Sequence, residues 1–122
     1  MSLRDKILAC DDIQRELVEI PEWGVILEVR GMNGADRSRI IEMVSDEQGN
    51  VSVGTMYVET VIASTYDPES GERVFSPTDR DALTAKAASA IDRIAKVGMR
   101  LSRMDGEATE EAKRQFPEAS SS

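Results

Sequence analysis

The sequence of 122 residues predicts a mainly α domain of the α+β class. In this fold a small N-terminal β-hairpin packs on a bundle of about four to five helices. Residues 25–30 show the alternating pattern of a strand with one buried face, and residues 87–104 carry the clearest amphipathic helical pattern of the chain. Start signals for two further helices lie at residues 33 and 76.

The first element predicted is a short helix within residues 3–13. Leu3, Ile7 and Leu8 recur there at helical intervals. Cys10 follows them, and we expect it to be a small buried residue of this helix, because the flanking charges exclude a lipoprotein signal.

The β-hairpin is predicted from two apolar runs joined by a turn. Residues 17–20 form the first run and residues 25–30 the second, and the segment Pro21-Glu22-Trp23-Gly24 supplies the turn. Trp23 has two interpretations, a core anchor or an exposed contact residue. Burial of so large a ring favours the first, and Trp23 also stays a candidate for protein contact.

The next helix is predicted to start at Asn33, which can cap it together with Asp36, and to end near Ser45. A loop follows over residues 46–50. Residues 51–65 combine β-branched side chains with a helical stripe. Their length favours a helix, although a strand stays open.

An acidic turn follows, in which Asp67, Glu69 and Glu72 surround Gly71. These carboxylates are the best candidate for a metal site. A calcium-binding loop that began at Asp67 would need a glutamate as its twelfth residue, and that position is Thr78. The favoured interpretation is therefore a solvated turn without metal.

Two helices close the predicted fold. Ser76 and Pro77 begin the first, which is expected to run to about Lys86. The second covers residues 87–104, and Gly98 on its apolar face suits the close approach of another helix. A basic stripe lies nearly opposite that face and is either a solvated surface or a contact with an acidic partner: Arg93, Lys96, Arg100 and Arg103.

We assign residues 1–104 to a single globular domain and residues 105–122 to an acidic, partly disordered tail. Fifteen Lys and Arg against 23 Asp and Glu give a net charge of -8, which disfavours nucleic acid and anionic membranes as partners. The chain has no His and one Cys, so disulfides, Cys/His zinc sites and imidazole-based catalysis are excluded. We predict no catalytic residue, no cofactor and an intracellular protein.

Two stretches carry a resemblance to a known family. Residues 20–24 read IPEWG, a strand ending in Val29-Arg30 follows, and residues 31–37 fit the pattern G-x-x-G-x-(D/E)-R before a helix. Residues 66–75 form an acidic glycine turn that leads into Phe75. Over most of residues 16–104 this resembles the tail assembly chaperones of long-tailed, siphovirus-type bacteriophages.

The resemblance implies a non-enzymatic protein of the infected host cytoplasm that is absent from the mature virion. Such a protein binds and solubilises the tape measure protein and helps to recruit the major tail (tube) protein. Self-association into a homo-oligomer stays open. Two alternatives remain: a structural subunit of the phage tail or neck, and a small bacterial adaptor that binds one protein through the basic stripe.

Overall fold

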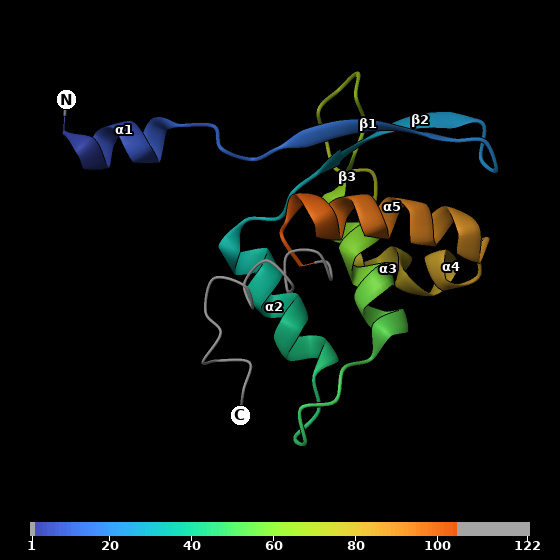
Figure 1. Cartoon of the computed structure of the whole chain (residues 1–122). Helices are drawn as coiled ribbons and strands as arrows, with labels where there is room; N and C mark the ends of the chain where they lie inside the picture. Colours follow the sequence, from blue (N-terminus) through green and yellow to red (C-terminus); the bar gives the residue numbers. More distant parts are fainter. Residues whose placement is uncertain (1, 105–122) are drawn as a thin grey trace.

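The computed structural model describes residues 2–104 and confirms the predicted fold class (Figure 1). Five α-helices and a three-stranded antiparallel sheet make up this part of the chain. The elements in chain order are α1 (Leu3–Ala9), β1 (Arg15–Ile20), β2 (Val25–Arg30), α2 (Gly34–Val44), α3 (Val53–Ser64), β3 (Thr65–Tyr66), a 3-10 turn (Pro77–Asp79), α4 (Arg80–Thr84) and α5 (Ala88–Leu101). The predicted tail 105–122 lies outside the described residues.

The predicted hairpin supplies β1 and β2 of the sheet, whose strand order β1-β2-β3 makes β2 the central strand. Val18 lies opposite Leu27, and both side chains point to the buried face. β3 is an addition that the sequence did not predict. Its two residues continue directly from α3, so that Thr65 pairs with Val29 at the other edge of β2.

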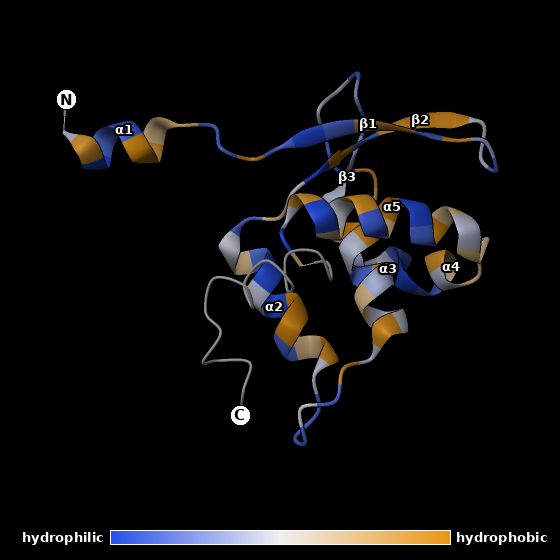
Figure 2. Cartoon of the chain, viewed as in Figure 1, coloured by the Kyte–Doolittle hydropathy of each residue, from blue (hydrophilic) through white to orange (hydrophobic). Residues whose placement is uncertain are grey.

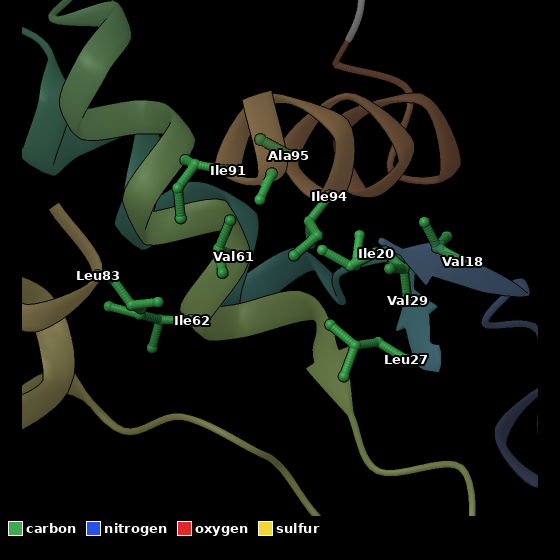
Figure 3. Packing of buried hydrophobic residues seen from close by; sticks show 11 residues of the cluster. Val18, Ile20, Leu27, Val29, Val61, Ile62, Leu83, Ile91, Ile94 and Ala95 are labelled. Atoms are coloured by element: carbon green, nitrogen blue, oxygen red, sulfur yellow. The ribbon is translucent and has the colours of Figure 1, made fainter. Parts of the chain in front are cut away.

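The main core lies between the hairpin and helices α3 and α5. Ile20, Val61 and Ile94 have no exposed surface, and Figure 3 shows them converging from these three elements. A second cluster, which includes Ile40 and Met32, fixes α2 against the side of α3. The alternation of residues 25–30 is confirmed for Leu27 and Val29, whereas Val25 at the strand end is 41% exposed.

Gly98 has the role that its position predicted. A Cβ atom there would lie 2.9 Å from Thr60 Cγ2 and 3.1 Å from Ser64 Oγ, both on α3. Because glycine removes this obstruction, α3 and α5 cross at close range. The helical interpretation of residues 51–65 is confirmed for Val53–Ser64, with α3 as one wall of the core, whereas Thr65 belongs to β3.

Local signals explain where the helices begin. Asn33 Oδ1 accepts a hydrogen bond from the Asp36 backbone N–H at 2.8 Å, as expected for the start of α2. At the next predicted start, Asp79 Oδ2 accepts from the Ser76 N–H at 2.9 Å. The helix predicted to run from Ser76 to about Lys86 is shorter in the structure. It consists of the 3-10 turn followed by α4, and α4 ends at Thr84.

The predicted burial of Cys10 is wrong. α1 ends at Ala9, none of its residues is buried, and Cys10 itself is exposed. The physical reason is visible in Figure 1: residues 10–14 lead α1 away from the hairpin and the helices, so no core surface covers it.

Candidate interaction surface

The basic stripe of α5 faces the hairpin at two points. Arg93 donates to both carboxylate oxygens of Glu22, at 2.6 Å and 3.1 Å, and Ser89 Oγ donates to the same carboxylate at 2.6 Å. These donors, Arg93 first, lower the pKa of Glu22 from 4.5 to about 2. The turn of the hairpin is therefore tied to the N-terminal half of α5.

The second point of attachment is near the other end of α5. Arg100 Nη2 contacts the two carboxylate oxygens of Glu16 at 2.8 Å and 2.9 Å. Lys96 lies on the exposed surface between these two attachments, and Arg103 follows the helix with a positive φ of 60°. Arg93 and Arg100 thus bind carboxylates of their own chain, which gives the stripe an internal role that local helix patterning did not reveal.

Trp23 lies in the turn between β1 and β2 and is half-buried against the main core. The turn is closed by hydrogen bonds from the Trp23 N–H to Ile20 O at 3.0 Å and from the Gly24 N–H to Pro21 O at 3.2 Å. Gly24 has a φ of 65°, which a side chain would disfavour. The anchoring interpretation of Trp23 accounts for this packing, and its remaining exposed edge leaves the contact hypothesis as a prediction.

A groove of about 500 Å³ lies where α3, α4 and the start of α5 meet. Its lining includes the apolar side chains of Tyr57, Val58 and Ile91. Arg80 of α4 and Glu59 of α3 form a bidentate ion pair in the same lining, with Arg80 Nη2 3.0 Å from Glu59 Oε1.

The Glu59–Arg80 pair was missed by the sequence analysis. Glu59 is 2% exposed, whereas the side chain of Arg80 is 41% exposed. A buried carboxylate is therefore paired with a guanidinium at the surface. The carboxylate of Glu59 raises the pKa of Arg80, chiefly through their hydrogen bond. One signal could have indicated it: Glu59 is a single charge within the otherwise apolar stretch of α3, and such a charge needs a partner when buried.

The most exposed large apolar side chains of residues 2–104 fall largely on α1 and on the hairpin. Figure 2 shows hydrophobic residues on both elements. Leu17 and Ile26 lie on the face of the sheet opposite the core and are 64% and 57% exposed. Together with Val25, Pro21 and Pro68 they line an open groove of about 600 Å³, which we call the hairpin groove. Glu19 and Glu69 also line it.

The acidic turn is held by hydrogen bonds between its own residues. Asp67 Oδ1 accepts from the Glu69 N–H at 2.8 Å, and the Gly71 N–H donates to Asp67 O at 2.8 Å. Within residues 2–104 no cluster of three or more acidic, Cys or His side chains is placed to hold a metal ion. In the same range no helix combines the length and the apolar character needed to cross a membrane.

Comparison with known proteins finds a likeness in structure but not in sequence. No family model matches the chain, and no curated protein matches it. Among solved structures, the chain is similar to the bacteriophage HK97 tail assembly chaperone, with a TM-score of 0.59 and 23% sequence identity over 83% of this chain and 95% of that one. At this level of identity the likeness shows a shared fold, the same one that the sequence resemblance implied.

Proposed function

We propose that this chain is a phage tail assembly chaperone that works by binding and not by catalysis. The observation that carries the proposal is the shared fold with the HK97 tail assembly chaperone, which extends over nearly all of that protein. A net charge of -8 supports it, because an acidic protein bound along an apolar partner keeps the complex soluble.

The proposed partner is the tape measure protein, a long helical protein that must stay soluble until the tail tube surrounds it. An amphipathic helix is recognised when its apolar side chains enter a groove. The groove between α3 and α4 suits this mode, because apolar side chains alternate there with charges of both signs, Arg80 and Lys86 against Asp81 and Asp92. We assign this groove to the tape measure protein.

The chaperone recruits the major tail (tube) protein while it covers the tape measure protein, acts in the host cytoplasm and is absent from the mature virion. Mass spectrometry of purified virions tests the last point. Stoichiometric amounts of the chain in the particle would favour a structural tail or neck subunit instead.

The decisive experiment is co-expression with the tape measure protein of the same phage, followed by size-exclusion chromatography with light scattering. We expect a soluble complex with several chaperone copies per partner, and aggregation of the partner alone. A tape measure protein that is equally soluble without this chain would refute the proposal.

A substitution in the groove locates the contact. Thr84 is exposed and lines the groove, so Thr84→Arg fills it without disturbing a buried side chain. We expect at least about a tenfold weaker complex, the usual effect of blocking an apolar contact. Ser38→Arg on the exposed face of α2 adds the same charge elsewhere and is expected to bind as the unsubstituted chain does.

A further inference from the structure

No residue of α1 is buried by the rest of residues 2–104. α1 is seven residues long, and its apolar side chains Leu3, Ile7 and Leu8 are 73%, 61% and 67% exposed. Ser2 caps it by accepting from the Asp5 N–H at 3.1 Å. A helix of this length is not stable alone in water, so its structure depends on a surface that covers the apolar side.

The hairpin groove offers such a surface. Its apolar floor is formed by Leu17, Val25 and Ile26, whose exposed fractions of 64%, 41% and 57% are high for a monomeric protein surface. Burial of these side chains against those of α1 would remove apolar area from water on both sides. Leu17 and Ile26 lie on the side of the sheet away from α3 and α5, and Val25 lies at the exposed end of β2, so docking on these three side chains leaves the core unchanged.

The charges of the two surfaces are complementary. Glu19 of β1 and Glu69 of the acidic turn both line the hairpin groove. α1 carries Arg4 and Lys6 beside its apolar residues, with Asp5 as its single acidic residue. Opposite charges at the rim of an apolar contact favour one orientation and disfavour other partners.

The direction of the linker excludes the chain's own groove as the resting place of α1. The Gly31 N–H donates to Gln14 O at 2.9 Å, and Arg15 pairs with Asp11 at 2.9 Å, so residues 11–14 continue the line of β1 outward. The hairpin groove lies toward the opposite end of the strand, near Pro21. To reach it, residues 10–14, which span at most about 17 Å, would have to reverse and break both interactions.

We propose that α1 of one copy docks in the hairpin groove of a second copy, so that the chain self-associates by exchange of its N-terminal helix. Leu3, Ile7 and Leu8 enter the floor of the groove, and Arg4 and Lys6 meet Glu19 and Glu69. Every copy carries both halves of the contact. The contact therefore closes a dimer when it is reciprocal and builds a ring or a longer series when it is not.

The first test is light scattering after size-exclusion chromatography of the full chain alone, over a range of concentrations. We expect an average mass above that of one chain, and an apparent Kd at least about tenfold higher for Ile7→Glu and for Ile26→Glu. Val53→Glu is the matched control, because Val53 is 58% exposed and lies outside both surfaces. A chain that stays monomeric up to about 1 mM, or an Ile26→Glu variant that associates normally, overturns the proposal.

A charge exchange and a cross-link test the pairing itself. Lys6→Glu is expected to weaken association, and Glu19→Lys in the same chain is expected to restore at least part of it. Cys10 is exposed just after α1 and is the single cysteine of the sequence. With Pro68→Cys added in the lining of the groove, oxidation should give disulfide-linked dimers and larger species, whereas exclusively monomeric oxidised chains would show docking within one copy and contradict the exchange.

These measurements use the chain alone, so their failure leaves the proposed chaperone function standing. Conversely, a chain that self-associates but does not solubilise the tape measure protein would uphold this contact and refute that function.

Discussion

Gly98→Ala places one methyl group into the closest helix contact of the structure. The new Cβ would lie 2.9 Å from Thr60 Cγ2, well inside the ~3.5 to 4.0 Å at which carbon atoms attract each other. Thr60 is fully buried and β-branched, so rotation about its χ1 is restricted and its methyl group cannot move toward solvent. Relief therefore requires α3 and α5 to move apart, which loosens the core that both helices share.

Two opposing effects set how much Gly98→Ala changes the free energy of unfolding. Replacing glycine by alanine within a helix stabilises it by up to about 1 kcal/mol, and overpacking a core destabilises a protein by about 1 to 3 kcal/mol. The short distance and the stiff neighbour place Gly98→Ala at the upper end of the second range. We expect a net loss of about 2 kcal/mol in the free energy of unfolding, which lowers the melting temperature by on the order of 10 °C.

Urea unfolding followed by circular dichroism measures this loss. Gly54→Ala is the matched control, since a Cβ there meets no atom within 4 Å and the substitution should raise stability slightly. Thr60→Ser removes the obstructing methyl group, so the double variant should recover part of the loss relative to the single substitutions. A Gly98→Ala variant as stable as Gly54→Ala would refute the packing argument.

Two other substitutions test separate parts of the fold. Gly31→Ala should destabilise the chain by about 1 to 3 kcal/mol. The added Cβ would lie 2.9 Å from the backbone oxygen of Leu101, which cannot rotate away. A urea midpoint equal to that of the unsubstituted chain would contradict this prediction. Arg93→Ala should lower the urea midpoint in a pH-dependent way. The pKa of Glu22 is lowered to about 2 in the folded chain, so the stabilisation by Arg93 is complete above pH 4.5 and is lost as the pH falls from there toward 2. A difference between the unsubstituted chain and Arg93→Ala that stays constant over this range would refute the assigned pairing.

Signals that act within a few residues were predicted well from the sequence. The cap at Asn33, the turn that holds Trp23 and the apolar face around Gly98 all depend on near neighbours, and the structure contains each of them. β3 was not predicted, because two residues are too few to show a period and Thr65 also continues the helical stripe of α3.

Interactions between distant residues were the ones that the sequence did not reveal. Nothing near Glu59 in the chain shows that Arg80 will reach it from α4, 21 residues later. The same holds for Arg93, whose partner Glu22 is 71 residues away. Cys10 was misplaced for a related reason: periodicity indicates that α1 has an apolar side, but not whether the same chain covers it.

The attachment of the hairpin to α5 also has a consequence for the order of folding. Glu16 and Arg100 are separated by 84 residues, so the hairpin is among the first elements to be synthesised and its main partner is the last helix described. Contacts of such long range delay folding until both of the segments that they join are present. We expect a nascent chain stopped before Ala88 to be digested rapidly by protease, and a chain extended through Leu101 to resist it. The inner side of the hairpin then lacks the cover of α5 until Leu101 has been synthesised, and the main core closes only after that point.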